Sequence, residues 1–319
     1  MTAHILPSSP TGGTEQGWPN PATSRARPRA DNPKGNTMGN LRKHLSVALV
    51  AAASMALTAC TTSTAAAPAS SPADGTSAGA TLVTVGASPA PHAKILQFVQ
   101  QNLAAKAGIT LKIVEFDDYV QPNEALASGE LDANYFQHLP YLTDQIKSKG
   151  YAFEHGAGVH IEPYAVFSSK YKAIADVPDG ASIAITNDAS NQYRGLKLLA
   201  DNGLLKDITT DSTVVNLTKA QNPRGFTFIE NQPEVIVQQL NDPKVDLAFI
   251  NGNFILTAGL NSADALLREK VADNPYANLL VWRSDNTNPG VAKLETLLHS
   301  QEVKDFIAKT WPSGDVIPG

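Results

Sequence analysis

The sequence predicts an α/β fold, and the order of its strands and helices permits two lobes. Segments rich in β-branched residues, beginning with residues 81–86, alternate along the chain with helical segments. Strands that are linked by helices form mostly parallel sheets. The strand predicted at residues 245–251 ends on a polar residue, Asn251, and so repeats the layout of an earlier strand. Two extended segments, residues 159–168 and 278–283, stand where the chain would cross from one lobe to the other and back.

In the first lobe, each predicted strand is followed by a helix. The strands are indicated by β-branched and alternating apolar residues. A Pro-rich turn at residues 87–92 leads into the first helix, and a later helix carries Pro140 in its first turn, where a missing N–H costs no hydrogen bond. The predicted strands are residues 81–86, 109–116 and 131–136, and the predicted helices are residues 93–107, 123–128 and 140–149.

The second lobe is predicted to begin after the first crossing. Ser190 is the expected N-cap of a helix at residues 195–202, whose free N–H groups would favour an anion beside them. Residues 207–217 and 226–230 are expected to add further segments to the second lobe. Residues 291–311 are expected to form helices that pack back on the first lobe. The other predicted elements are strands at residues 181–186 and 245–251 and helices at residues 233–240 and 254–260.

Residues 129–141 carry the polar and aromatic side chains on which the functional prediction depends. The strand in this stretch runs off the carboxyl edge of its sheet, and in open α/β sheets ligands bind in the crevice outside such edges. The edge would present a group of side chains together, namely Asn134, Phe136, Gln137, His138 and Tyr141. The residues alone also allow a core strand with one hydrogen-bonded histidine.

Two adjacent motifs carry a family resemblance. They read Phe116-Asp-Asp-Tyr-Val-Gln-Pro-Asn-Glu-Ala-Leu126 and Asp132-Ala-Asn-Tyr-Phe-Gln-His-Leu-Pro-Tyr141. This pair resembles the signature of the methionine-binding lipoproteins, the extracytoplasmic receptors of methionine ABC importers, and the similarity runs from about Val83 to the C-terminus. The resemblance implies a type II periplasmic-binding-protein fold, with a ligand cleft between two lobes joined by two crossing strands. It also implies delivery of methionine to a membrane permease with its cytoplasmic ATPase, without a cofactor and without enzyme activity.

The same resemblance assigns ligand contacts. The stretch Ser190-Asn-Gln-Tyr-Arg194 matches the family's Thr/Ser-Asn-x-x-Arg pattern, so Asn191 and Arg194 inherit contacts, and Asn251 matches an asparagine that binds the ligand's backbone groups. Arg194 is the expected partner of the ligand carboxylate, because a guanidinium can form two parallel charge-assisted hydrogen bonds with it. Aromatic rings attract thioether sulfur. An aromatic wall is therefore expected from Tyr119, Phe136, His138 and Tyr141.

Two positions depart from the family pattern. Tyr135 occupies its variable place, and Tyr164 follows Glu162-Pro where other members carry Met or Ile. The pocket size and the preference for L- or D-methionine therefore stay open. Glu162 is an alternative contact for the ligand's ammonium group.

The first 80 residues are predicted to lie outside the lobes. Residues 1–37, rich in Pro, Gly, Ser and Arg, are expected to be a disordered extension or a mis-assigned start. Residues 38–59 have the positive start and apolar run of a secretory signal peptide. Their end and the next residue, Leu57-Thr-Ala-Cys60, resemble the bacterial lipobox, which implies acylation of Cys60, anchoring on the extracytoplasmic face of the cell membrane, and a flexible tether over residues 60–80. The remaining residues divide into a first lobe, residues 81–165 and 281–319, and a second lobe, residues 166–280.

Composition excludes several classes of function. Hydrophobic residues make up 42% of the chain and charged residues 17%, as in globular proteins. Six of the 25 Lys and Arg residues but only two of the 30 Asp and Glu residues precede Cys60, so the rest is more acidic than the whole chain, whose net charge is −5. No basic stripe with interleaved aromatic residues is present, which argues against nucleic-acid binding. Cys60 is the only cysteine, so no intrachain disulfide can form. Separately, the protein is expected to be a monomer.

Three alternatives remain open at this point. A metal receptor would use His138, His155 and His160 as zinc ligands, since imidazoles are ordinary ligands of this ion. A secreted enzyme is disfavoured because the chain has no Gly-x-Ser-x-Gly, His-Glu-x-x-His or phosphate-binding Gly-rich loop. The third alternative keeps the fold but binds a methionyl dipeptide or another apolar amino acid.

Overall fold

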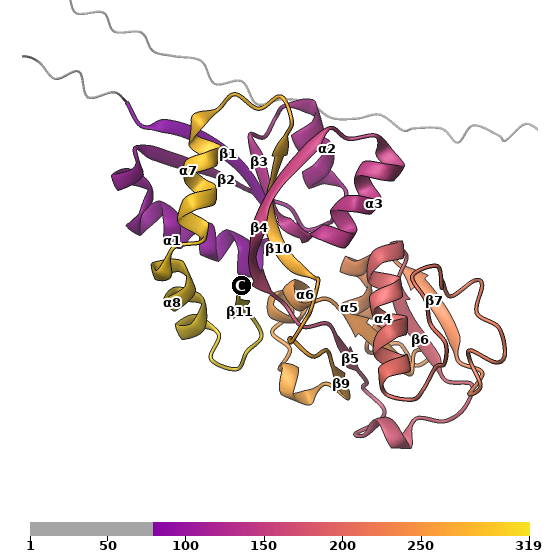
Figure 1. Cartoon of the computed structure of the whole chain (residues 1–319). Helices are drawn as coiled ribbons and strands as arrows, with labels where there is room; N and C mark the ends of the chain where they lie inside the picture. The colour runs from indigo at the N-terminus through magenta and orange to yellow at the C-terminus, as the bar shows by residue number, and fades with distance from the viewer. Residues whose placement is uncertain (1–78) are drawn as a thin grey trace, which may run out of the picture. The chain divides into compact units, whose positions relative to one another are not determined.

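The computed structural model describes residues 79–319, which belong to one compact unit (Figure 1). They form two β-sheets with helices packed around each, in agreement with the predicted α/β class. The predicted signal peptide, Cys60 and most of the predicted tether lie outside the described residues. Within residues 79–319, no helix is both long enough and apolar enough to cross a membrane.

The first sheet has six strands in the order β11-β4-β10-β3-β1-β2. β1 pairs in parallel with β2 and β3, whereas β10 runs antiparallel between β3 and β4. Its strands are β1 (Thr81–Ala87), β2 (Ile109–Glu115), β3 (Ala133–His138), β4 (Phe153–Ile161), β10 (Ala277–Arg283) and β11 (Ile317–Pro318). Its helical segments are η1 (Pro89–Ala93), α1 (Lys94–Asn102), η2 (Ala104–Ala107), α2 (Gln121–Ser128) and α3 (Leu139–Lys149).

The second sheet has five strands in the order β7-β6-β8-β5-β9. β6 is parallel to β7 and β8, and β5 runs antiparallel to β8 and β9. Its strands are β5 (Ala165–Phe167), β6 (Ser182–Thr186), β7 (Thr227–Asn231), β8 (Leu247–Ile250) and β9 (Leu267–Arg268). Its helical segments are η3 (Ile174–Asp176), α4 (Ala189–Asp201), α5 (Pro233–Gln239), α6 (Gly252–Thr257) and η4 (Ser262–Asp264).

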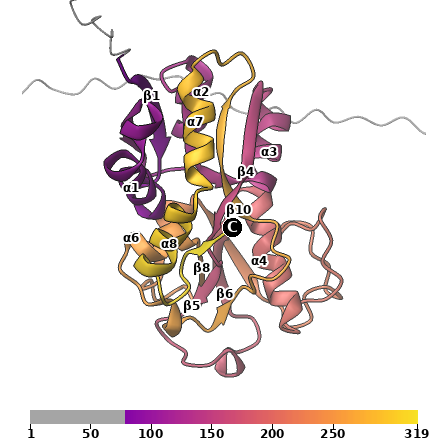
Figure 2. The same cartoon turned by 60° about the vertical axis from the view of Figure 1, so that its left-hand side comes forward.

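The last two helices, α7 (Pro289–Leu298) and α8 (Gln301–Thr310), return to the first sheet. Figure 2 shows them, in yellow, beside α1 and β1. Val291 and Ile307 are buried in the same apolar core as Val83, and the rings of Phe98 and Phe306 stack with centroids 4.3 Å apart. The N-terminal and C-terminal segments of the described chain therefore share one core.

Several predicted elements differ from the structure. Residues 278–283, expected as the second crossing, lie in β10, because their backbone pairs with β3 on one side and β4 on the other. The chain passes between the sheets earlier, in residues 269–276, and in the opposite direction in residues 162–164. Residues 207–217 form no helix or strand.

The ends of β3 and β8 carry the polar residues that define the site. Gly129 ends α2 with a φ of 85°, a conformation that glycine adopts without steric cost, and the chain then enters β3. All six residues of β3 are buried, as are Leu247–Ile250 of β8. Tyr141 in the first turn of α3, and Asn251, Gly252 and Asn253 at the start of α6, line one pocket.

Candidate functional site

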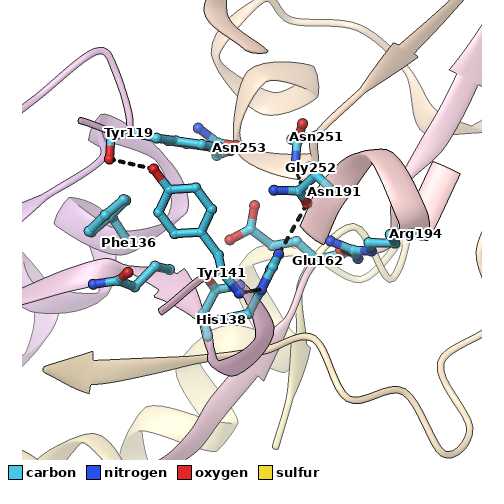
Figure 3. A pocket seen from close by; sticks show the side chains of 12 residues that line it. Tyr119, Phe136, His138, Tyr141, Glu162, Asn191, Arg194, Asn251, Gly252 and Asn253 are labelled. Atoms are coloured by element: carbon cyan, nitrogen blue, oxygen red, sulfur yellow. Dashed lines mark hydrogen bonds between the residues drawn. The ribbon is translucent and has the colours of Figure 1, made fainter. Parts of the chain in front are cut away.

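One pocket gathers all seven of the residues that the resemblance marks as ligand contacts (Figure 3). The cavity volume of this pocket is about 20 Å³, close to what one water molecule needs. Some of the side chains that line this pocket come from segments associated with the first sheet, and others come from segments associated with the second. The lining residues are Tyr119, Phe136, Gln137, His138, Tyr141, Glu162, Asn191, Arg194, Asn251, Gly252, Asn253 and Asn278.

An aromatic cluster forms one part of the lining. The ring centroid of Tyr119 lies 5.9 Å from that of Phe136, 5.8 Å from that of Tyr141 and 5.3 Å from that of Phe254. The Tyr141 hydroxyl donates to the backbone carbonyl of Tyr119 at 2.9 Å, and the Tyr119 hydroxyl donates to Oδ1 of Asn253 at 2.5 Å. Both hydroxyls are thus satisfied within the protein, and the rings offer an apolar surface.

A chain of amide and imidazole hydrogen bonds fixes the orientation of the polar side chains. Asp188 accepts from the backbone N–H of Asn191 at 2.8 Å and from its Nδ2 at 3.0 Å. Because Nδ2 faces Asp188, Oδ1 of Asn191 points away from it. That oxygen accepts from Nε2 of His138 and from Nδ2 of Asn251, each at 3.1 Å. Nδ1 of His138 accepts from the backbone N–H of Tyr141 at 3.2 Å, so the proton of this imidazole is on Nε2.

This chain leaves one acceptor unpaired. Oδ1 of Asn251 is buried and has no hydrogen-bond partner among the described residues. A buried polar atom without a partner costs roughly 1–3 kcal/mol. Burial and then the charge of Arg194 lower the pKa of His138 to about 3, so its imidazole is neutral near pH 7 and donates no second proton to the pocket.

The predicted N-cap of α4 is wrong. The helix begins at Ala189, six residues earlier than expected, and its N-cap is Asp188, whose carboxylate accepts from the backbone N–H of Asn191. Ser190 lies in the first turn and donates its hydroxyl to the same carboxylate at 3.0 Å. The carboxylate is the better cap here because it accepts from several donors at once.

Arg194 has a protein carboxylate as its partner. Its Nε lies 2.9 Å from Oε1 of Glu269, and its Nη2 lies 2.5 Å from Oε2 of Glu269 and 2.8 Å from the backbone carbonyl of Glu162. The guanidinium also lies 4.3 Å from the ring centroid of Tyr276 and 5.2 Å from that of Tyr164. Nη1 makes no hydrogen bond within residues 79–319 and is the nitrogen that remains for a ligand.

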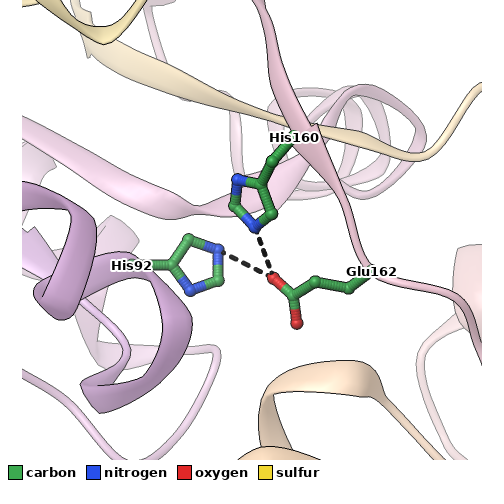
Figure 4. Close-up of side chains that lie close together, drawn as sticks. All are labelled: His92, His160 and Glu162. Atoms are coloured by element: carbon green, nitrogen blue, oxygen red, sulfur yellow. Dashed lines mark hydrogen bonds and ion pairs between the residues drawn. The ribbon is translucent and has the colours of Figure 1, made fainter. Parts of the chain in front are cut away.

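A second polar cluster joins the pocket at Glu162 (Figure 4). Nε2 of His160 lies 2.8 Å and Nε2 of His92 lies 3.3 Å from the same carboxylate oxygen, Oε1 of Glu162. Nδ1 of His160 contacts the Tyr135 hydroxyl, and Nε2 of His92 also lies 3.2 Å from Oδ1 of Asn278. Burial lowers the pKa of His92 to about 4 and that of His160 to about 3, and it raises the pKa of Glu162 to about 7.

The histidines expected in a zinc receptor do not come together. His138 lies in the pocket, His160 lies in the Glu162 cluster, and His155 is exposed with its Nδ1 at 2.8 Å from the carbonyl of Gly156. Within the described part of the chain, the group with ligand atoms close enough for a metal ion is His92, His160 and Glu162. His160 hydrogen-bonds to this carboxylate and Nε2 of His92 contacts Oδ1 of Asn278, so these ligand atoms already have protein partners.

Sequence reasoning missed several residues of the site. Asp188 acts through Asn191 and Glu269 acts through Arg194; Asp188 is a residue type that often caps helices, whereas nothing in the local sequence marks Glu269. Asn253 and Asn278 also line the pocket, although neither belongs to the motifs at residues 116–126, 132–141 and 190–194. Asn134, expected at the sheet edge, is instead buried beneath the pocket, where its Nδ2 donates to Oδ1 of Asn123 at 2.9 Å.

Comparisons with known proteins identify relatives over nearly the whole described region. A family model described as NlpA lipoprotein matches residues 83–319. The chain is 37% identical over 251 residues to the methionine-binding lipoprotein MetQ of Bacillus subtilis (strain 168), covering 76% of this chain and 90% of the relative. It is 34% identical over 236 residues to the D-methionine-binding lipoprotein MetQ of Salmonella typhi, covering 73% and 87%.

Solved structures agree with these matches. A putative lipoprotein from Actinomyces odontolyticus is 49% identical with a TM-score of 0.71, and the match covers 75% of this chain and 99% of that one. A nutrient binding protein from Burkholderia cenocepacia bound to methionine is 39% identical with a TM-score of 0.69, covering 74% and 99%. The predicted family and the predicted two-lobed fold class are thereby confirmed.

Proposed function

The chain belongs to the NlpA lipoprotein family, and from this premise we propose that it is an extracytoplasmic receptor that binds methionine and delivers it to an ABC importer. One observation carries the proposal: a single pocket combines a cation, a buried amide oxygen without a partner and an aromatic cluster. A free amino acid with an apolar side chain offers the complementary carboxylate, ammonium and side chain. The protein is a receptor in this proposal and performs no catalysis.

Each part of methionine has a proposed contact. Its carboxylate pairs with Arg194 through Nη1, and its ammonium donates to Oδ1 of Asn251, whose orientation Asn191 holds. Its thioether lies against the aromatic wall of Tyr119, Phe136, His138 and Tyr141. Sulfur–aromatic contacts contribute roughly 0.3–1.5 kcal/mol and burial of the side chain roughly 1.5–3 kcal/mol.

Two lobes are proposed to close over this ligand. We place the first lobe at residues 81–161 and 277–319 and the second at residues 165–268, with the crossings between them, which moves the expected boundaries at residues 165 and 281. His138 and Tyr119 of the first lobe donate to Asn191 and Asn253 of the second, so both lobes contribute to the same pocket. Opening would break these contacts and admit the ligand.

Calorimetry on protein that has been stripped of ligand tests the proposed function. The protein is unfolded in guanidinium, washed, refolded and titrated with L-methionine, D-methionine, a methionyl dipeptide and leucine. We expect methionine to bind most tightly, and mass spectrometry of the material released by unfolding should detect it. Tighter binding of the dipeptide or of leucine would support the alternative ligand, and binding of none would refute the proposal.

We also propose that the mature protein begins at Cys60 and is held at the membrane by acyl chains on this cysteine, as a monomer. Each buried CH₂ contributes about 0.8 kcal/mol, so several chains anchor stably where one would not. Labelled palmitate should enter the wild type, and the Cys60→Ser variant should stay unlabelled and leave the membrane fraction. Equal labelling of the two proteins would rule out this attachment site.

A further inference from the structure

Glu162 is a buried carboxylate that reaches into the pocket (Figure 3). Its exposed fraction is 5%, and those of His92 and His160 are 1% and 0%. Nε2 of His160 lies 2.8 Å from Oε1 of Glu162, and an ionised carboxylate can only accept, so the imidazole proton lies on Nε2 and Nδ1 accepts from the Tyr135 hydroxyl. Nε2 of His92, in η1, lies 3.3 Å from the same oxygen and 3.2 Å from Oδ1 of Asn278. Two imidazoles from different elements thus contact one carboxylate oxygen, as Figure 4 shows.

This carboxylate has no cation of its own among the described residues. Both histidines that touch it are neutral near pH 7. Arg194 donates to the backbone carbonyl of Glu162, and its guanidinium is paired with the side chain of Glu269. A buried charge without a partner of opposite sign is unfavourable, and the arrangement therefore favours a cationic group in the pocket.

The position of Glu162 suits a ligand ammonium group. Its side chain packs against Gly252, the residue that follows Asn251, and a Cβ on that glycine would lie 3.0 Å from Oε2 of Glu162. Asn251 supplies the unpaired buried oxygen of the same pocket. An ammonium has three N–H donors, so a carboxylate and an amide oxygen can both accept from it.

We propose that Glu162 binds the ammonium group of the ligand, and that His92 and His160 are positioning residues that hold its carboxylate in the pocket. The inference rests on the proposed function, because it assigns one end of an amino acid whose other end binds Arg194. It adds a residue that selects for amino acids over carboxylic acids without an amine. The ligands that fit this assignment are compounds that carry a primary ammonium group next to a carboxylate.

The same arrangement makes binding dependent on pH. The groups that face Glu162 are His92 from η1, His160 from β4, Arg194 from α4, Tyr135 from β3, Tyr119 before α2 and the backbone of Asn253. Burial raises the pKa of Glu162 to about 7, and an ammonium beside it would lower this pKa. Binding near pH 7 should therefore release a proton. Affinity should fall by up to about tenfold per pH unit below 7 and level off above it.

A comparison of two ligands in two proteins tests the assignment. The ligands are L-methionine and 4-(methylthio)butanoate, which lacks the amine, and the proteins are the wild type and Glu162→Gln, both full-length and stripped of ligand. We expect the wild type to prefer methionine by at least about a hundredfold and Glu162→Gln to lose at least about tenfold of this preference. Binding of the butanoate should be similar in both. Glu295→Gln is the matched control, because Glu295 also pairs with a histidine, His299, at 2.9 Å but outside the pocket.

The positioning role has its own readout. His160→Phe removes one N–H from the carboxylate, which should move the pH at which affinity levels off to a higher value. A merely structural role would lower the melting temperature without moving that pH. An unchanged pH profile in His160→Phe would overturn the positioning role.

The other outcomes are also decisive. A Glu162→Gln protein that keeps the full preference for methionine would overturn the inference while leaving the proposed function intact. Methionine binding that is lost in EDTA and restored by zinc would overturn it in favour of a metal held by His92, His160 and Glu162. A wild type that binds neither compound would overturn the proposed function and the inference together.

Discussion

Arg194→Ala is expected to weaken methionine binding by at least a hundredfold. Charge-assisted hydrogen bonds contribute roughly 1.5–3 kcal/mol each, and about 1.4 kcal/mol is a factor of ten in Kd. Loss of the guanidinium leaves the ligand carboxylate buried without a cation, which adds to the cost. Calorimetry on stripped protein measures the change.

The pairing of Arg194 with Glu269 requires a control. Alanine at 194 also leaves the Glu269 carboxylate, whose side chain is only 14% exposed, without its partner, and the fold will lose stability. The double variant Arg194→Ala/Glu269→Ala removes both charges, so it should recover much of the melting temperature while binding stays weak. Recovery of binding along with stability would show that Arg194 holds the fold together and does not hold the ligand.

Two milder substitutions complete the series. Asn251→Ala removes the unpaired oxygen while Arg194 keeps the carboxylate, so its effect should be smaller than that of Arg194→Ala. Tyr141→Phe keeps the ring and loses only a hydroxyl that donates to a backbone carbonyl within the protein, so its effect should be the smallest. The three affinities rank the contributions of the guanidinium charge, the Asn251 amide and the Tyr141 hydroxyl.

Local sequence patterns predicted most elements because the required signals are local. The strand at residues 81–86 and the helix at residues 140–149 follow from β-branched content and from Pro140, and the structure has β1 and α3 at these places. The crossing at residues 278–283 could not be separated from a sheet strand by pattern. Asn278 and the apolar residues after it are compatible with a crossing segment and with a strand inside a sheet. Only their backbone pairing with β3 and β4 identifies them as a strand of the first sheet.

The site was predicted where a motif carried it and missed where contacts were long-range. Glu269 lies 75 residues from Arg194, in an irregular segment that no periodicity marks. His160 and Glu162 are neighbours at the end of β4, but His92 comes from η1, much earlier in the chain, and no local pattern shows that it reaches them. Asp188 and Ser190 are both good capping residues, so the sequence alone could not choose between them.

Gly252 begins α6 directly after Asn251, at the point where the helix touches Glu162. A Cβ at this position would lie 2.5 Å from the Cβ of Glu162, an atom that cannot turn away, because it is fixed by its own backbone. Alanine normally favours a helix over glycine by about 1 kcal/mol, so any loss in Gly252→Ala comes from this collision. Relief of the collision requires a shift of Glu162 or of Asn251, both of which line the pocket.

Gly252→Ala is therefore expected to lower stability by roughly 1–3 kcal/mol and to weaken methionine binding by about tenfold or more. Gly290→Ala is the matched control: it too lies at the start of a helix, α7, and its added Cβ would lie 2.4 Å from Cγ2 of Val83, outside the pocket. Both variants should unfold at lower denaturant concentration than the wild type, and only Gly252→Ala should lose affinity in calorimetry. Equal affinities for the two variants would mean that the contact between Gly252 and Glu162 supports the fold alone, and that the ligand does not depend on where this carboxylate stands.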